Sequence, residues 1–401
     1  MLLGLAWAVV GISITFEANC ENSPQFINSQ LSVRLERLHL LNFRNYTTVD
    51  VVFEGLIHCF LGRNGSGKTN LLDAIHYLSF TRGPTSNPDA SNIRHGEDLF
   101  LVRGVFQLSE KPKEVTCSYS PDRKKKIAED GKEYTRFSEH IGKYPLVIVA
   151  PGDIELVWDG GAVRRKFLDT LLSQMNKEYL EQLMVYQTHL RHRNGLLKMY
   201  AERAAVDKEL LATYDNRLVA AGTYIYEQRK ELVNRIEPRV QQHYSFLVNG
   251  DAEWPGIQYE SDLDTVDFRQ ELLLRLDRDI ALGRTSVGIH RDDFRFTLQG
   301  YDLKSYGSQG QQKSFLIALK LAEFDCLFQK NGFKPLLLLD DIFDKLDDDR
   351  ILKLMQLIMK GTFGQILITD ARPGRSLDVL REAGVNSQNF EVNNGSLVVL
   401  P

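Results

Sequence analysis

One stretch of this chain has the residue types and the spacing of a phosphate-binding loop. Residues 62–69 read GRNGSGKT and match the pattern G-x-x-x-x-G-K-[ST]. The three glycines allow successive backbone N–H groups to turn inward around a β-phosphate. Lys68 can reach the β and γ oxygens of the nucleotide and is therefore a predicted catalytic residue. Thr69 supplies the hydroxyl that ligates Mg²⁺ in such loops. The pattern predicts a MgATP site formed by Gly62, Arg63, Asn64, Gly65, Ser66, Gly67, Lys68 and Thr69.

A pair of carboxylates near the other end of the chain could complete this chemistry. Residues 335–341 read PLLLLDD. We expect Asp340 to hold Mg²⁺ through water, and the catalytic Asp341 to orient or deprotonate the attacking water. An apolar run that ends in Asp-Asp can also be a strand that meets an ordinary surface loop. The phosphate-binding loop in the same chain favours the catalytic interpretation.

A third segment, SQGQQK at residues 308–313, begins a predicted helix with small and polar residues. The start of a helix presents free N–H groups and is an anion site. The loop at residues 62–69 already binds the phosphates of its own nucleotide, so a second anion site suggests closure over a γ-phosphate held by another subunit. The candidate nucleotide-binding residues are Ser308, Gly310 and Gln311. The alternative is an ordinary helix cap by Ser308.

Particular elements must position these segments. The apolar run LIHCFL before Gly62 predicts a buried strand, and NLLDAIHYLSF from Asn70 predicts a helix whose N-terminus points at the phosphates. Four consecutive leucines at 336–339 fit a strand that is buried on both faces of a parallel sheet. Open sheets of this kind bind ligands at the carboxyl ends of their strands. The expected fold class is therefore α/β.

The rest of the chain predicts two further parts. Alternating apolar and polar residues between Leu99 and Phe137, with Asp130-Gly131 as a hairpin turn, predict an antiparallel side sheet. Residues 152–237 contain no proline and have the spacing of amphipathic helices. We expect an inserted helical arm at 156–285 and an ATPase lobe formed by 34–155 and 286–401.

The overall charge limits how the chain could meet nucleic acid. The 401 residues carry a formal net charge of −4, so contact with DNA would need local basic patches. Candidate patches are Arg123 to Lys126, Arg164 to Lys166, and Arg191 with Arg193, which we expect near a helix end or turn. Each patch can equally be a solvated surface.

Cysteine usage and the N-terminus bear on the compartment. The four cysteines lie far apart without C-x-x-C spacing, which indicates a reducing, cytoplasmic environment and no structural zinc. The apolar stretch at residues 1–16 is short for a bilayer and lacks the positive start of a secretory signal. We interpret residues 1–33 as an N-terminal extension. The alternative is a membrane anchor.

The motifs together resemble one family. They are LERLHLLNFRNY (35–46), GRNGSGKTNLLDAIHYLSF (62–80), APGDIELVWDGGAVRRKFLD (150–169), GIHRDDF (288–294), YGSQGQQKS (306–314) and LLLLDDIFDKLD (336–347). With them the chain resembles the RecF family of bacterial DNA replication and repair ATPases, which are relatives of the SMC and ABC ATPases. The resemblance implies an ABC/SMC-type ATPase head, ATP and Mg²⁺ as cofactors, and an ATP-dependent homodimer. It also implies repair of gapped or stalled DNA, RecO-like and RecR-like partners, and no membrane.

The resemblance assigns further residues and has two departures. It implies that Asp347 is a nucleotide-site carboxylate that lies across the dimer interface. Where the wider ABC pattern has a catalytic glutamate, this chain has Asp341, which is one methylene shorter and implies slow turnover. Asp370 stands where a switch histidine is usual, and no glutamine occurs near Val149 to Asp153.

Two other functions share parts of this pattern. The nucleotide-binding subunit of a membrane transporter would have the same composite site, but the long proline-free arm and GIHRDDF argue against it. A P-loop kinase would need an acceptor site and would give no role to SQGQQK. Absence of ATP-induced self-association would favour the kinase.

Overall fold

The computed structural model describes residues 32–84, 87–108, 110–202, 207–248, 250, 253–342, 348–382 and 384–400. The predicted extension of residues 1–33 therefore lies almost wholly outside the described chain. Val33 is already buried, and its N–H donates to the carbonyl of Lys334 at 3.0 Å. Within the described residues, none of the helices is both long enough and apolar enough to cross a bilayer.

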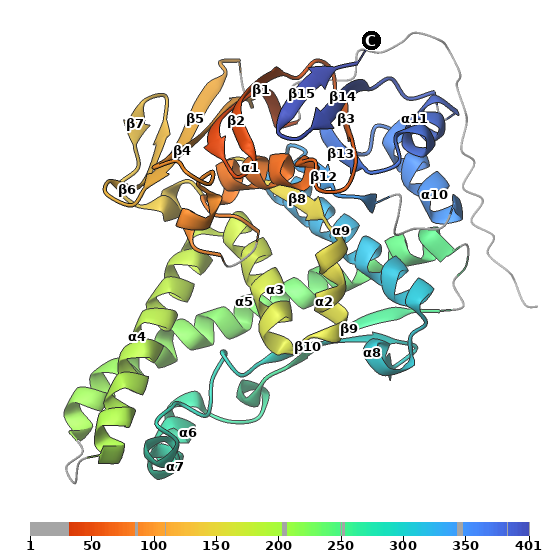
Figure 1. Cartoon of the computed structure of the whole chain (residues 1–401). Coiled ribbons are helices and arrows are strands. Elements are labelled where there is room, and N and C mark those ends of the chain that lie inside the picture. Colours follow the sequence, from red (N-terminus) through yellow and green to blue (C-terminus); the bar gives the residue numbers. More distant parts are fainter. Residues whose placement is uncertain are drawn as a thin grey trace, which may run out of the picture.

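A six-stranded sheet that is parallel except at one edge forms the centre of the upper part of the molecule (Figure 1). Its strands, in order across the sheet, are β15 (Ser396–Val399), β14 (Gln388–Asn393), β3 (Ile57–Leu61), β13 (Ile366–Asp370), β12 (Leu336–Leu339) and β8 (Leu146–Val149). Only the pairing of β14 with β15 is antiparallel. The carboxyl ends of β3, β13, β12 and β8 consequently meet along one edge, where the predicted site residues follow them.

A second sheet of six strands is entirely antiparallel. Asp130 and Gly131 connect its last two strands with φ values of 50° and 76°, the left-handed backbone that a tight hairpin turn requires. The predicted antiparallel side sheet is thus confirmed. Its order is β2 (Tyr46–Val52), β1 (Arg34–Phe43), β4 (Phe100–Gln107), β5 (Lys113–Ser120), β6 (Lys124–Glu129) and β7 (Lys132–Glu133).

Two hydrophobic cores lie on opposite faces of the parallel sheet. Leu336 and Leu338 belong to one core, which also contains the antiparallel sheet and helix α1 (Lys68–Phe80). Leu337 and Leu339 belong to the other core, which contains the long helices below the sheet. Successive side chains of a strand point to opposite faces, so a strand between two cores needs apolar residues at every position. This requirement explains the run of four leucines.

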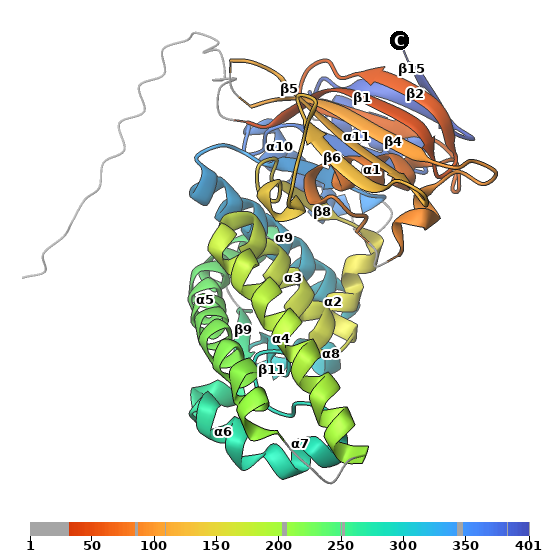
Figure 2. The ribbon, with the colours of Figure 1, turned by 90° about the vertical axis from the view of Figure 1, so that its left-hand side faces the viewer.

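The lower part of the molecule is mainly helical (Figures 1 and 2). Helices α4 and α5 run side by side into a projecting arm, and α9 packs along α5. Helix α5 continues through Pro238. The long helices are α3 (Gly161–Met175), α4 (Lys177–Glu202), α5 (Lys208–Val248) and α9 (Gln309–Asn331).

Short elements complete the described fold. A small antiparallel sheet packs on α5, and the single-turn helix α8 (Leu303–Tyr306) packs on that sheet. The helices α10 and α11 cover the six-stranded parallel sheet near its C-terminal strands β13 and β14 (Figure 1). These elements are α2 (Glu155–Trp158), β9 (Pro255–Glu260), α6 (Phe268–Leu274), α7 (Leu276–Leu282), β10 (Asp293–Leu298), β11 (Tyr301–Asp302), α8 (Leu303–Tyr306), α10 (Asp348–Met359) and α11 (Pro373–Glu382).

Candidate nucleotide site

The predicted phosphate-binding loop joins the carboxyl end of β3 to the start of α1. Gly65 and Gly67 have φ values of +80° and +118°, which L side chains rarely adopt, and a Cβ at Gly67 would collide with the side chain of Asn45. The buried ammonium group of Lys68 bends back over the loop. It donates to the carbonyls of Gly62 at 2.9 Å and Arg63 at 3.2 Å. The loop therefore holds its lysine at the place where phosphate oxygens bind in such loops.

Oxygen ligands converge beside this loop. The hydroxyl of Thr69 lies 3.1 Å from both carboxylate oxygens of Asp340, which follows β12. The N–H of Asp340 donates to the carbonyl of Val149, the last residue of β8, at 2.8 Å. This hydrogen bond fixes the backbone of Asp340 at the end of β12. A hydroxyl and a carboxylate are the hard oxygen donors that Mg²⁺ prefers, usually together with water and substrate phosphates. The donor set thus fits the predicted metal.

A residue that the sequence reasoning missed joins the two aspartates. The buried hydroxyl of Thr369 donates to Asp340 Oδ1 at 2.7 Å and accepts the N–H of Asp341 at 2.9 Å. Thr369 lies on β13, the neighbour of β12, so only the strand order brings these residues together. The available sequence signal was a hydroxyl residue directly before Asp370 at the end of an apolar strand.

We expect Thr369→Val to weaken magnesium-dependent hydrolysis. Valine keeps the volume but removes the hydrogen bonds that orient Asp340 and satisfy the Asp341 N–H. Loss of a group that orients a metal ligand typically costs about 10–100-fold in metal affinity or activity. Titration of ATP hydrolysis with Mg²⁺ should show a raised magnesium requirement, and Thr369→Ser should restore it. A wild-type magnesium dependence for the valine variant would show that Thr369 does not contribute to the metal site.

Two more of the predicted carboxylates lie at the carboxyl ends of neighbouring strands. Asp341 has a left-handed backbone with φ 45°, a conformation that aspartate tolerates better than most residues. Asp370 ends β13, is 1% exposed and accepts the N–H of Arg372 at 2.9 Å. Both therefore lie at the same sheet edge as Asp340. The remaining predicted carboxylate, Asp347, lies outside the described residues.

The turn between β1 and β2 braces the phosphate-binding loop, which the sequence reasoning did not anticipate. Asn45 donates to the carbonyl of Ser66 at 2.9 Å and accepts from Asn70 at 2.8 Å. Arg44 donates to Asn70 Oδ1 at 2.8 Å and forms an ion pair with Asp73 on α1. Burial raises the pKa of Asp73, and the neighbouring Arg44 opposes that shift. A polar turn thus ties the antiparallel sheet to the middle of the loop and to helix α1.

The candidate anion site at residues 308–313 lies at the start of α9. Ser308 is the N-cap: its hydroxyl oxygen accepts the N–H of Gln311 at 3.2 Å, and the Gln311 side chain accepts the N–H of Ser308 at 2.8 Å. Ser308 is exposed and Gly310 is half-buried. Among the described residues, no hydrogen bond joins Ser308, Gly310 or Gln311 to the phosphate-binding loop of the same chain. The predicted cap is therefore present at the start of α9.

The motif GIHRDDF at residues 288–294 lies between the arm helices and the core. Asp292 accepts from Arg229 at 3.0 Å, and Asp293 forms an ion pair with Arg164 at 2.8 Å. His290 contacts the Tyr186 hydroxyl at 2.8 Å, and burial lowers its pKa to about 4, so its imidazole is neutral at pH 7. The motif serves here to connect α3, α4 and α5.

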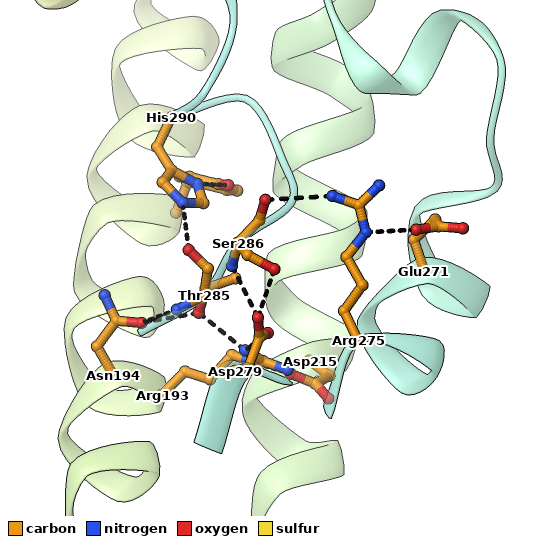
Figure 3. Close-up of polar contacts among 10 residues, drawn as sticks. Arg193, Asn194, Asp215, Glu271, Arg275, Asp279, Thr285, Ser286 and His290 are labelled. Atoms are coloured by element: carbon orange, nitrogen blue, oxygen red, sulfur yellow. Dashed lines mark hydrogen bonds and ion pairs between the residues drawn. The ribbon is translucent and has the colours of Figure 1, made fainter. Parts of the chain in front are cut away.

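A buried network continues from this motif into the arm (Figure 3). Arg193 donates to Asp215 at 2.6 Å and to Asp279 at 2.8 Å, and it also donates to Thr285 at 2.8 Å. The expectation that Arg191 and Arg193 lie near a helix end or turn is wrong, because both lie within α4. Arg193 is fully buried and cannot meet DNA.

Arg193→Met should destabilise the protein strongly. Removal of the cation leaves the buried carboxylates of Asp215 and Asp279 without their partner, and breaking a buried pair typically costs about 3–5 kcal/mol. The matched control is Arg191→Met, which removes the same charge from an exposed position on the same helix. Thermal denaturation should give a much lower Tm for Arg193→Met than for the control. Equal Tm values would contradict a structural role for the network.

The geometry defines a class of protein. A phosphate-binding loop and an aspartate follow strands of one parallel sheet, an antiparallel sheet covers α1, and a helical part carries a separate exposed helix start. This combination is that of an ABC-type ATPase head.

The chain belongs to the RecF family. The profile of the RecF/RecN/SMC N terminal domain matches residues 34–393. A DNA replication and repair protein RecF from Flavobacterium johnsoniae is 40% identical over 362 residues, which cover 90% of this chain and 100% of that protein. The RecF of Cytophaga hutchinsonii is 41% identical over 368 residues, 92% of this chain and 97% of the relative. The predicted family and fold class are confirmed.

Solved structures agree with this assignment. A structure of the recombination mediator protein RecF-ATP in the RecFOR pathway has a TM-score of 0.84 and 28% identity, and the match covers 94% of this chain and all of that chain. The Smc head domain from Pyrococcus furiosus, at 17% identity and a TM-score of 0.52, shares the fold over 92% of this chain and 96% of its own.

Proposed function

We propose that this chain is a DNA-binding ATPase of replication and recombinational repair that forms a homodimer when ATP binds. The convergence of Lys68, Thr69 and Asp340 at one edge of the parallel sheet carries the ATPase part of the proposal. Relatives about 40% identical over nine tenths of the chain are DNA replication and repair proteins, which supports the same role here rather than that of a transporter subunit or a kinase.

Each site residue has a role that follows from its chemistry. The backbone N–H groups of residues 62–67 and the Lys68 ammonium bind the β- and γ-phosphates of ATP. Thr69 and Asp340 would hold Mg²⁺, which neutralises phosphate charge when bound. Asp341 orients or deprotonates the water, and its short side chain fits slow turnover. Asp370 takes the position of the switch residue at the end of β13.

A second copy of the chain would complete the site. The hydroxyl of Ser308 accepts one hydrogen bond as a cap, and its O–H can still donate to a phosphate oxygen. Together with the half-buried Gly310 and Gln311 it forms a helix start that, among the described residues, has no hydrogen bond to the phosphate-binding loop of its own chain. We infer that these residues bind the γ-phosphate held by the other subunit, and that Asp347 lies near the same interface. ATP would favour the dimer through its higher affinity for the closed pair.

The order of the helices and strands along the chain supports a division into an ATPase lobe and an inserted arm. We propose residues 34–155 and 286–401 as the ATPase lobe, residues 156–285 as the inserted arm, and residues 1–33 as an extension. The arm contains α3, α4 and α5, and the chain returns to the parallel sheet with β12 after α9. Because α9 packs along α5, the exposed helix start at Ser308 is held by the arm and by the ATPase lobe together.

DNA contact would come from part of the predicted patches. Arg164 is paired with Asp293, Lys125 with Asp89 and Lys126 with Glu133, so these cations are already compensated within the chain. Arg165 donates to the backbone carbonyl of Asp292. Arg123, Lys124 and Arg191 are exposed members of these patches. We propose DNA, RecO-like and RecR-like proteins as partners in the cytoplasm, in line with the RecFOR pathway named for a structural relative.

Sedimentation of the full chain tests the proposal. Without nucleotide we expect a monomer, with MgATP a dimer, and with MgATP and gapped or duplex DNA a complex that contains both. A protein that stays monomeric at saturating ATP would contradict the composite site. A dimer that forms with ATP but never sediments with DNA would support the ATPase part of the proposal and contradict its DNA-binding part.

A further inference from the structure

The start of α9 is joined to the arm by a short chain of hydrogen bonds. The side-chain N–H of Gln311 donates to Glu253 Oε1 at 2.8 Å, and the hydroxyl of Tyr244 donates to Glu253 Oε2 at 2.7 Å. Tyr244 is fully buried near the end of α5, the 41-residue helix that extends into the arm (Figure 1). Glu253 lies just before β9, so one carboxylate bridges α5 and α9.

This bridge fixes the side-chain amide of Gln311 at both ends. The amide oxygen accepts the N–H of Ser308 at 2.8 Å, while the amide N–H donates to Glu253. A carboxylate accepts hydrogen bonds but does not donate them, so Glu253 selects the N–H side of the amide and leaves the oxygen for Ser308. The backbone N–H of Gln311 in turn donates to the Ser308 hydroxyl oxygen at 3.2 Å. The geometry at Ser308 therefore depends on Glu253.

Two neighbouring side chains hold the same turn of α9 against other elements. The buried Gln312 donates to the carbonyl of Gly307 at 3.0 Å, in the turn before the helix. The hydroxyl of Ser314 accepts from Arg350 Nε on α10 at 2.6 Å and donates to the carbonyl of Gly310 at 2.9 Å. The carboxylate bridge adds the arm to these supports. The first turn of α9 is thus held by three parts of its own chain.

We propose that Glu253 is a positioning residue of the two-subunit ATP site. It holds the start of α9 in the geometry that receives the γ-phosphate bound by the other subunit, and it makes this geometry depend on the position of the arm helix α5. A misplacement of about 1 Å in a site of this kind can cost roughly 10²-fold in rate. The inference rests on the two-subunit site of the proposed function.

Glu253→Ala breaks the bridge, so it should reduce ATP-dependent dimerisation and hydrolysis by roughly 10–100-fold. ATP binding by the monomer should be unchanged, because residues 62–69 are intact. Glu253→Gln should restore most of the activity, since its amide oxygen can accept from Gln311 and its amide N–H can donate to the Tyr244 hydroxyl. Tyr244→Phe keeps the buried ring and removes only the hydroxyl, so it should give a smaller loss of the same kind.

Sedimentation with and without MgATP and steady-state hydrolysis give these readouts, and thermal denaturation reports on folding. The matched control is Glu227→Ala, which removes an exposed glutamate from α5 and should behave as the wild type. Mixing then assigns the defect to one side of the dimer. Lys68→Ala disables the phosphate-binding loop but leaves α9 intact. Its mixture with Glu253→Ala should regain hydrolysis, because the intact loop of one subunit faces the intact helix start of the other.

The outcomes separate this inference from the proposed function. Wild-type dimerisation and hydrolysis by Glu253→Ala would overturn the inference and leave the two-subunit site standing. Loss of ATP binding by the monomer, or no recovery in the mixture with Lys68→Ala, would place Glu253 in the site of its own subunit or in the stability of the fold, and would also overturn it. Normal ATP-driven dimerisation and hydrolysis by a Ser308→Arg variant would overturn the two-subunit site and the inference together.

Discussion

Lys68→Ala should reduce ATP hydrolysis by about 10²–10³-fold and weaken ATP binding at the same time. The ammonium is the charge that compensates the β- and γ-phosphates, and loss of one transition-state donor in a closed site typically has an effect of this size. Its present partners are the carbonyls of Gly62 and Arg63, so the loop holds it in place before ATP arrives.

Hydrolysis and ATP affinity of the purified variant give the comparison. Lys330→Ala is the matched control, because it removes an exposed lysine from the far end of α9. The Tm of the variant should stay close to that of the wild type, which separates a chemical defect from misfolding. Near-normal hydrolysis by Lys68→Ala would mean that the site has been placed wrongly.

Asp341→Asn should separate binding from turnover. Asparagine keeps the shape of the side chain but cannot accept a proton, so hydrolysis should fall by about 10²-fold or more while ATP still binds. The ATP-dependent dimer should then persist longer than that of the wild type, because its release requires hydrolysis.

The neighbouring carboxylate supplies the control for this prediction. Asp340 lies 3.1 Å from the Thr69 hydroxyl, and we assign it to the metal. Asp340→Asn should therefore lose magnesium-dependent ATP binding, whereas Asp341→Asn should retain it. If Asp341→Asn lost ATP affinity to the same degree, Asp341 would be a metal ligand and not the residue that serves the water.

Local patterns were sufficient to predict much of the architecture. Glycine spacing at residues 62–67 and the four leucines of β12 carry their meaning in a few consecutive residues, because backbone freedom and two-sided burial are local requirements. The Asp130-Gly131 turn was predictable for the same reason. Resemblance over nearly the whole chain then indicated the RecF family.

The sequence patterns did not predict contacts between residues that lie far apart in the chain. Thr369 contacts Asp340 because β13 lies beside β12, and Asn45 reaches Ser66 because the β1–β2 turn folds over the loop. Neither contact has a signature in spacing. Arg193 was misjudged for a related reason: a basic residue on an amphipathic helix is usually exposed, and only its two distant carboxylates explain its burial.

The central claim is that one ATP site needs two copies of the chain, and mixing two inactive variants tests it most directly. Ser308→Arg puts a bulky cation at the exposed start of α9 but leaves residues 62–69 intact. Alone, it should bind ATP as a monomer and neither dimerise nor hydrolyse ATP. Thr265→Arg, which adds the same charge at an exposed position on the arm, should behave as the wild type.

The decisive measurement is ATP hydrolysis by an equimolar mixture of Ser308→Arg and Lys68→Ala proteins. In a heterodimer, the intact loop of the first subunit faces the intact Ser308 of the second, so the mixture should regain activity from at most one working site per dimer. Each protein alone should remain inactive at the same total concentration. Normal ATP-driven dimerisation and hydrolysis by Ser308→Arg alone would show that Ser308 is only a helix cap, and the two-subunit site would be wrong.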